Sequence, residues 1–507
     1  MNVLLIIIMV IYCICAVALF LYGLNCYVMI GLFMRSRKRQ KHEDEAILAH
    51  FAETKSDADL PVVTTQLPIF NEKFVIERLL KAVCAFDYPR GKHEIQVLDD
   101  STDETVEIVA RLVNELRAQG HDIHHIHRKD RKGYKAGALA YGMKIARGEM
   151  FAIFDADFVP PPDFLRKTVP FLVEDDNCGF VQTRWGHRNR DYSILTMAQS
   201  IGIDGHFVVE QSARAWNGLF LNFNGTAGIW RRKAIDEAGG WQSDTITEDL
   251  DLSYRTQLAG WTARFLFDVV TPAEIPININ AFKSQQHRWA KGSIQTAIKI
   301  LPKVLSRRDI GLFKKLQAVL HLTHYSVHPV IVLMTLLVLP LLLWGHVNFR
   351  PFVIIPLLSM MVISMMAPST LYVFSQRMAY PDWKSKLKFL PTLMILGMGL
   401  AVNNTLGVIE AIFKRDHGVF VRTPKLGIAA ETHAKERTEP EALHGYRIPL
   451  NGMFLAETFM GIWAIAALAA YLSLFKFLIG PILLLHASGF LYVGFVSILH
   501  NRNTRHS

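Results

Sequence analysis

The chain has 507 residues, of which 51% are hydrophobic and 20% charged. This balance, with a mean hydropathy of +0.21, is too apolar for an ordinary soluble enzyme and leaves room for one globular unit plus a membrane part. The formal charge of +10 fits either a nucleic-acid-binding protein or basic loops that face anionic lipid. The five cysteines lack CxxC spacing, which argues against a disulfide scaffold and against a structural zinc site.

The first predicted element is a membrane helix with its basic flank, over residues 1–41. No charged residue lies between Val3 and Met34, whereas Arg and Lys are frequent from Arg35 to Lys41. The apolar run is too long for a signal peptide, and no basic stretch precedes it. The positive-inside rule then places the N-terminus outside and the basic flank in the cytosol. Residues 42–59 read as a polar linker.

Residues 60–300 are predicted to form a cytosolic α/β domain. Short apolar runs, such as residues 95–98 and 150–154, alternate with helix-like stretches such as 105–116. This alternation predicts a mixed, mostly parallel sheet with helices on both faces. In such sheets, ligands bind beyond the carboxyl ends of the strands.

The rest of the chain is predicted to be mainly membrane helices. Apolar runs lie at about 318–345, 351–376, 389–409, 458–475 and 477–500. The run at 389–409 contains Asn403, Asn404 and Thr405, so we expect residues 389–413 to form a helix in the membrane interface, which leaves those polar residues unburied.

The other four runs and the first helix make five crossings. Two crossings fall within 301–388, after an interfacial segment, and two fall within 451–507, before a basic tail. Five crossings keep the basic loop 414–450 in the cytosol, as the positive-inside rule expects. The excess positive charge is thereby explained without nucleic acid.

Two acidic clusters follow predicted strands. Asp99 and Asp100 can accept hydrogen bonds from a nucleotide base or ribose, although Ser101 with Glu104 also matches a helix capping box. In the second cluster, residues 155–157, Asp155 and Asp157 can offer oxygen ligands to Mg²⁺ or Mn²⁺, which in turn can hold a diphosphate. The alternative for this second cluster is a solvated turn.

A third acidic cluster precedes a predicted helix. Asp249 could act as a general base toward a sugar hydroxyl, with Glu248 supporting it or contacting substrate. A helix capped by Thr247 with acidic residues in its first turn is the alternative.

An aromatic and basic cluster follows the globular region. Trp289 could stack on a sugar while Gln285 and Arg288 bind acceptor and phosphate. By itself this cluster favours an anchor among lipid headgroups.

Two further features depend on the rest of the chain. Thr423 and Lys425, in the basic loop, could close over a diphosphate or belong to a plain linker. His321, His324 and His328 share a helical face, which is compatible with a zinc site but favours a polar channel wall or an interfacial belt.

Taken together and in this order, these motifs resemble the signature of processive family 2 glycosyltransferases, the group that contains cellulose, hyaluronan and mannan synthases. The segments 66–72, 96–103, 133–137, 224–228 and 420–425 look most similar to plant cellulose-synthase-like mannan and xyloglucan-backbone synthases and their bacterial relatives. The resemblance covers roughly residues 60–430.

The resemblance implies a GT-A fold and an inverting enzyme that uses a nucleotide-diphosphate sugar, either UDP-glucose or GDP-mannose, to extend a β-linked glycan. It further implies a role for each motif residue. Asp99 and Asp100 would hold the nucleoside, with Lys135 beside the nucleotide. Asp155 and Asp157 would lie at the diphosphate, with Asp157 the stronger candidate for direct metal contact, and Thr423 and Lys425 would belong to a gating loop. Asp249 would be the base, and Gln285, Arg288 and Trp289 would bind the acceptor.

Two other functions stay open on the sequence. One is transfer of one or a few sugars onto a membrane lipid, and the other is a transporter with a non-catalytic cytosolic domain. The expected location is a bacterial inner or plasma membrane, or the Golgi in a eukaryote. The cytosolic regulatory domain of bacterial cellulose synthases is not expected, so direct control by a cyclic dinucleotide is doubtful.

Overall fold

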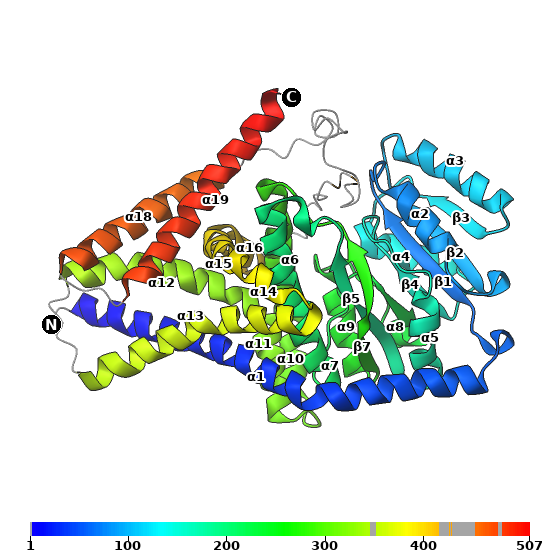
Figure 1. Ribbon diagram of the computed structural model, residues 1–507, viewed down its shortest axis with the longest axis horizontal. Coiled ribbons are helices and arrows are strands. Elements are labelled where there is room, and N and C mark those ends of the chain that lie inside the picture. The colour runs from blue at the N-terminus through cyan, green and yellow to red at the C-terminus, as the bar shows by residue number, and fades with distance from the viewer. Residues whose placement is uncertain are drawn as a thin grey trace.

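The computed structural model describes residues 3–344, 351–414, 425, 427, 452–474 and 479–506. An α/β domain lies at one end of the molecule and a bundle of apolar helices at the other (Figure 1). Helix α1 (Val3–Thr54) runs along both. It is helical through most of the segment predicted as a linker.

The α/β domain is built on a seven-stranded sheet with the order β3-β2-β1-β4-β6-β5-β7. Strand β6 is antiparallel to β4 and β5, and the other pairings are parallel. The predicted fold class, a mixed and mostly parallel sheet, is therefore confirmed. The strands are β1 (Val63–Ile69), β2 (His93–Asp99), β3 (Asp122–His127), β4 (Met150–Ile153), β5 (Cys178–His187), β6 (Gly228–Arg231) and β7 (Thr262–Ala273).

Helices cover both faces of the sheet. Side chains alternate along a strand, so Met150 and Ala152 of β4 pack into one core while Phe151 and Ile153 pack into the other. The first core includes α2 (Ile76–Cys84), α3 (Thr105–Ala118) and α5 (Phe164–Val173). The second includes α4 (Tyr134–Ile145), α8 (Arg232–Glu237) and α9 (Glu248–Leu258).

A middle layer of helices lies between the sheet and the apolar bundle (Figure 1). It consists of α6 (Ile194–Asp204), the π-helix η4 (Gly205–Gln211), α7 (Ser212–Trp216), α10 (Ile279–Ser306) and α11 (Leu312–Leu322). This layer brings the residues after β5 and β7 close to the apolar helices.

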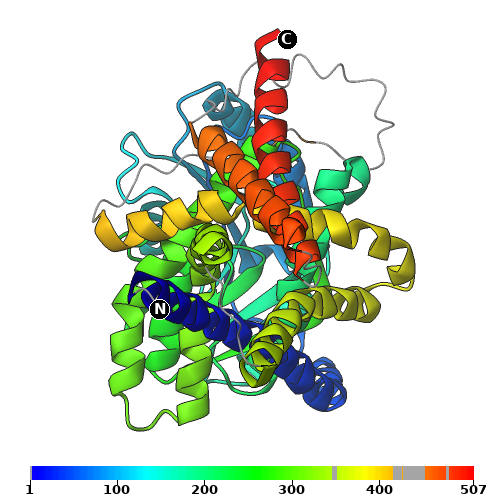
Figure 2. The same ribbon diagram turned by 90° about the vertical axis from the view of Figure 1, so that its left-hand side faces the viewer.

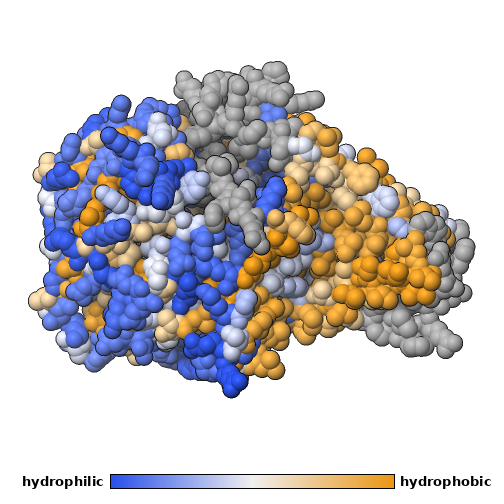
Figure 3. Space-filling view, turned by 180° about the vertical axis from the view of Figure 1, so that it is seen from behind, coloured by the Kyte–Doolittle hydropathy of each residue, from blue (hydrophilic) through white to orange (hydrophobic). Residues whose placement is uncertain are grey.

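The apolar end gathers helices from both ends of the chain (Figure 2). After α1 these are α12 (Val327–Trp344), α13 (Pro351–Ala379), α14 (Trp383–Lys386), α15 (Leu390–Gly399), α16 (Ala401–Phe413), α18 (Met453–Ser473) and α19 (Gly480–His506). On the face that Figure 3 shows, the surface of these helices is predominantly hydrophobic, in contrast to the α/β domain.

Within the described residues, four helices are long and apolar enough to cross a membrane, in Val3–Thr54, His324–Leu343, Met453–Ser473 and Gly480–Asn501. The pair Trp383–Gly399 and Ala401–Phe413, bent by 41°, would make a fifth if it is one span. Several apolar helices thus indicate membrane association. The predicted crossing at 351–376 stays a prediction.

The reason for predicting an interfacial helix at 389–413 was wrong in one respect. Asn403 and Asn404 are buried against protein, not left exposed. The Asn403 amide donates to the Lys283 carbonyl oxygen at 2.9 Å, and the Asn404 amide lies 3.0 Å from His328 Nε2. Because both amides have partners, the polar residues in this helix do not require contact with water.

Candidate active site

The acidic clusters meet at one edge of the sheet. Strands β2, β1 and β4 are parallel neighbours, so their carboxyl ends lie on the same side. Asp99 ends β2, whereas Asp155 and Asp157 follow β4. The sheet therefore brings together the two strand-end motifs that the sequence predicted to bind nucleotide and diphosphate.

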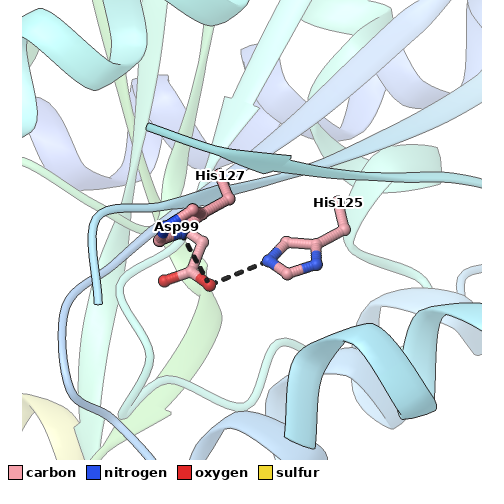
Figure 4. Close-up of side chains that lie close together, drawn as sticks. All are labelled: Asp99, His125 and His127. Carbon is pink, nitrogen blue, oxygen red and sulfur yellow. Dashed lines mark hydrogen bonds and ion pairs between the residues drawn. The ribbon is translucent and has the colours of Figure 1, made fainter. Parts of the chain in front are cut away.

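Asp99 is fully buried and already has protein partners. Its Oδ2 lies 2.8 Å from His125 Nε2 and 3.7 Å from His127 Nδ1 (Figure 4), and its Oδ1 accepts from the Ser101 amide at 2.8 Å. Burial opposes ionisation, but the hydrogen bonds from His125 and Ser101 outweigh it and hold the pKa of Asp99 below its usual value. Asp99 therefore orients two imidazole rings.

These three side chains lie close enough to share a metal ion, the one such group of three among the residues with described placement. Two imidazoles suit zinc better than Mg²⁺ or Mn²⁺. The group is therefore a poor fit for the ion that a diphosphate needs.

Asp100 is held by an arginine that the sequence analysis did not select. Arg128 Nε and Nη2 contact the two Asp100 carboxylate oxygens at 2.7 and 2.5 Å. The capping box that was the alternative for this segment does not form. Helix α3 begins at Thr105, and the Ser101 hydroxyl accepts instead from the Asn71 backbone amide. This leaves Asp100 and Arg128 as a charged pair at the sheet edge.

Lys135 links the second acidic cluster to the turn at Gly225. Its ammonium group lies 2.5 Å from Asp155 Oδ1 and donates to the Gly225 carbonyl oxygen at 2.8 Å. Burial acts to lower the pKa of Lys135, but Asp155, Glu248 and Asp249 outweigh it and raise the pKa above the usual value. Lys135 therefore stays a cation amid three acidic side chains.

Asp157 is paired with a lysine from the predicted gating loop. Lys425 Nζ lies 2.6 Å from Asp157 Oδ2 and 2.8 Å from the Glu274 carbonyl oxygen. Asp155 and Asp157 thus present carboxylate oxygens to cations, which is the donor chemistry that Mg²⁺ or Mn²⁺ requires. Thr423, the other residue expected in the gating loop, lies outside the described residues.

The third cluster begins helix α9. Burial, above all, raises the pKa of both carboxyl groups, that of Glu248 to about 8 and that of Asp249 to about 6. Thr247 does not cap the helix through its side chain but pairs with Thr296 of α10 at 3.1 Å. An Asp249 carboxyl group that ionises near neutral pH suits a general base.

The fourth cluster lies on α10 and faces the same site. Burial lowers the pKa of Arg288 to about 10, and the nearby Asp155 and Glu248 carboxylates oppose that shift. Trp289 and Gln286 line a cavity that also contains Asp249. The predicted Gln285 is half-buried and does not contribute to the described lining of this cavity.

The cavity has a volume of about 610 Å³ and continues among the apolar helices. From Asp249 and Trp289 it reaches Tyr12 of α1, Met361 of α13 and His486 of α19. The three histidines singled out in the sequence, His321, His324 and His328, line it. His321 contacts Tyr254 and His328 contacts Asn404, so these rings form part of a polar wall. Among the described side chains, they are not in a group close enough to share a metal ion.

Sequence reasoning missed several polar residues of this site. Arg128 stands just before the glycine-rich segment 133–137, and this position could have suggested it. His206 and Glu210 also line the cavity, and their four-residue spacing was the one available signal.

Comparison with known proteins agrees with this geometry. Residues 66–238 match the family model described as glycosyl transferase family 2. This segment is similar to family 2 glycosyltransferase domains. It contains the Asp99–Asp100 pair, Lys135, Asp155, Asp157 and the turn at Gly225, so the predicted resemblance is confirmed and the sheet is that of a GT-A-type glycosyltransferase.

The similar curated proteins are plant enzymes. The chain is 40% identical over 310 residues to glucomannan 4-beta-mannosyltransferase 1 of Oryza sativa subsp. japonica, covering 60% of this chain and 59% of that protein. It is 40% identical over 297 residues to glucomannan 4-beta-mannosyltransferase 2 of Arabidopsis thaliana, covering 58% and 55%. The chain thus spans somewhat more than half the length of these relatives.

Among solved structures, the chain is similar to the mannosyltransferase PcManGT from Pyrobaculum calidifontis in complex with GDP-Man and Mn²⁺. The TM-score is 0.47 at 18% identity, over 78% of this chain and all of that one.

Proposed function

We propose that the protein is a membrane-embedded, inverting glycosyltransferase that moves a hexose from a nucleotide-diphosphate sugar to the end of a β-linked glycan. The observation that carries this proposal is the position of Asp249. It is a carboxylate with a raised pKa in the same cavity as Trp289, beside the edge where Asp155 and Lys135 meet. A transporter would have no use for this arrangement.

The chain's own residues divide the reaction between them. Asp249 takes the proton of the acceptor hydroxyl as that oxygen attacks the anomeric carbon in a single displacement. Lys135 and Arg288 offer positive charge near the departing diphosphate. A Mg²⁺ or Mn²⁺ ion, held by Asp157 and Asp155, would supply further charge stabilisation for the diphosphate. Asp100, with Arg128, would lie at the nucleoside.

The acceptor is proposed to be a growing glycan, not a single lipid. Trp289 offers an aromatic face to a sugar ring, with Arg288 and Gln285 nearby on α10. The cavity leads from this tryptophan between α1, α12, α13 and α19, which supports a path for the product across the membrane. The proposed orientation keeps the catalytic domain in the cytosol, in a bacterial inner or plasma membrane or in the Golgi.

Both GDP-mannose and UDP-glucose fit the proposal, and the names of the plant relatives favour mannose. The test is to incubate purified protein with each radiolabelled donor and Mn²⁺, and to digest the product with a β-mannanase or a β-glucanase. We expect mannanase-sensitive polymer from GDP-mannose. A short glycolipid without polymer would favour the lipid-glycosylating alternative, and no transfer from any donor would contradict the proposal.

A further inference from the structure

The π-helix η4, in the middle layer of helices, carries polar side chains that face the cavity of the candidate active site. Its backbone hydrogen bonds span five residues, so residues four and five positions apart share a face. On this face lie His206, Glu210 and Gln211. The first two line the cavity that contains Asp249 and Trp289. Helices of this type are rare in proteins, and those that occur are often found at functional sites.

These side chains form a chain of hydrogen bonds that runs through Asn224. Gln211 donates to Asn224 Oδ1 at 2.5 Å, which turns the Asn224 amide nitrogen toward His206 Nε2, 3.1 Å away. The other ring nitrogen, His206 Nδ1, lies 3.0 Å from Glu210 Oε2. The network therefore fixes the tautomer: Nδ1–H donates to Glu210, and Nε2 accepts from Asn224.

Glu210 keeps its charge within this network. Burial acts to raise the pKa of its carboxyl group, but the hydrogen bond with His206 and the charge of Arg214 outweigh burial and lower it. An ionised carboxylate holds the imidazole ring in one orientation, as second partners of functional histidines commonly do.

Asn224 begins a turn that contacts three groups of the catalytic site. The Gly225 carbonyl oxygen accepts from Lys135, and the Thr226 hydroxyl accepts from the Asp155 backbone amide at 2.9 Å. Gly225 has φ +79°, and a Cβ atom there would lie 3.0 Å from Asp249 Oδ2. A shift of this turn would therefore displace Lys135, Asp155 and Asp249 together.

We propose that His206 is a positioning residue for sugar transfer: oriented by Glu210, it holds Asn224, and thereby the turn that sets Asp249 against Lys135 and Asp155. This inference deepens the proposed function and rests on it. It assigns to η4 the task of linking the wall of the acceptor cavity to the catalytic base.

Two substitutions of the same residue separate this role from simple packing. In His206→Gln, the side-chain oxygen can reach the place of Nε2 and accept from Asn224. In His206→Asn, the shorter amide reaches only the place of Nδ1. With GDP-mannose, Mn²⁺ and β-1,4-mannotetraose, we expect His206→Asn to lower kcat about 10- to 100-fold, as for a misplaced catalytic group, with the acceptor KM unchanged. We expect His206→Gln to restore most of the rate.

Two kinetic results would overturn the inference. Equal rate losses in both variants would make His206 a packing residue, and a raised acceptor KM with unchanged kcat would make it an acceptor contact.

A double-mutant cycle gives a readout that does not require activity. His206→Asn and Asn224→Ala should lower Tm by less together than the sum of their separate effects, because each breaks the same hydrogen bond. Additive losses would overturn the inference. If the wild-type chain transfers no sugar in the kinetic assay, the proposed function fails, and this cycle still decides whether positions 206 and 224 are coupled.

Discussion

The pKa values of two adjacent carboxyl groups at the start of α9 bear on which of them can act as the proposed base. The pKa of Asp249 is raised to about 6 and that of Glu248 to about 8, in both cases chiefly by burial. At neutral pH Asp249 is therefore mostly a carboxylate, able to accept a proton, whereas Glu248 is mostly protonated and can donate a hydrogen bond. This difference favours Asp249 as the base.

Replacing Asp249 should stop transfer without preventing nucleotide binding. We expect Asp249→Asn to lower kcat by about 10²- to 10⁴-fold, the contribution typical of a general base. Binding of GDP to the purified variant, measured by calorimetry, should match wild type because Asp100 and Lys135 are untouched. Asp309→Asn, at an exposed site between α10 and α11, is the matched control and should keep full activity.

The pH dependence of transfer distinguishes the two carboxyl groups. A base works only when ionised, so the wild-type rate should rise with pH through a midpoint near 6, the pKa of Asp249. Glu248→Gln should leave that midpoint unchanged, because Glu248 is already protonated when Asp249 titrates. A midpoint displaced toward 8 in the wild type, or abolished by Glu248→Gln, would assign the base to Glu248.

Lys425 and a divalent ion would compete for the same carboxylate oxygen. The ammonium group lies 2.6 Å from Asp157 Oδ2, within the space of an ion coordinated there. We expect Lys425→Met to strengthen Mn²⁺ binding about three- to ten-fold in the absence of nucleotide, because a repelling charge is gone. Titration calorimetry measures this, with the exposed Lys414→Met as control. Unchanged affinity would show that Asp157 does not hold the ion.

At the scale of elements, a buried polar contact joins the α/β domain to the apolar helices. Asp204 at the end of α6 lies 2.9 Å from His187 of β5 and accepts from the Gln376 amide of α13 at 2.8 Å. Burial opposes ionisation of Asp204, but His187 and Gln376 outweigh it and lower its pKa. The Asp204 carboxylate thus connects α6 with β5 and α13.

Removing this carboxylate should loosen the two halves of the molecule. We expect Asp204→Ala to cost about 3 kcal/mol of unfolding free energy, because it leaves buried partners unpaired. The readout is Tm in detergent, which should fall by several degrees. Asp236→Ala, on the exposed side of α8, should leave Tm unchanged. If Asp204→Ala has the same Tm as Asp236→Ala and the wild type, Asp204 does not hold the two halves together.

Sequence patterns predicted the elements of the catalytic domain better than the contacts between them. The alternation of strands and helices from β1 to β4 was readable because each parallel strand forms a short apolar run. The antiparallel strand β6 follows no local signal, since its direction depends on the path of the middle layer. The burial of Asp99 beside His125 could not be predicted, because it arises from the neighbouring strand β3.

At the scale of the whole molecule, the cavity is what the sequence predicted least. It is lined by residues as distant in the sequence as Tyr12, Asp249 and His486, which come to share one cavity only when the first and last helices pack together. The motif with Trp289, taken alone, favoured a lipid anchor. Its position in the wall of the cavity that Asp249 also lines supports the proposed contact with the acceptor. Distant contacts of this kind leave no periodic trace in a single sequence.

Neighbouring methionines on α13 test whether the product passes through this cavity. Met365 lines the cavity, whereas the next residue, Met366, is 48% exposed on the outer, apolar surface. Tryptophan at position 365 would fill the passage between α1, α12 and α13, because the indole ring is much larger than the thioether chain. Tryptophan at position 366 adds the same ring outside it.

We expect Met365→Trp to shorten the polymer made from radiolabelled donor, or to stop elongation after a few sugars, while GDP binding stays at the wild-type level. Met366→Trp should give product of wild-type length, as measured by gel filtration of the labelled glycan. The reaction centre is unchanged in both variants, so the difference between them reports on the passage alone. Full-length polymer from Met365→Trp in stable, well-folded protein would mean that the glycan leaves by another route.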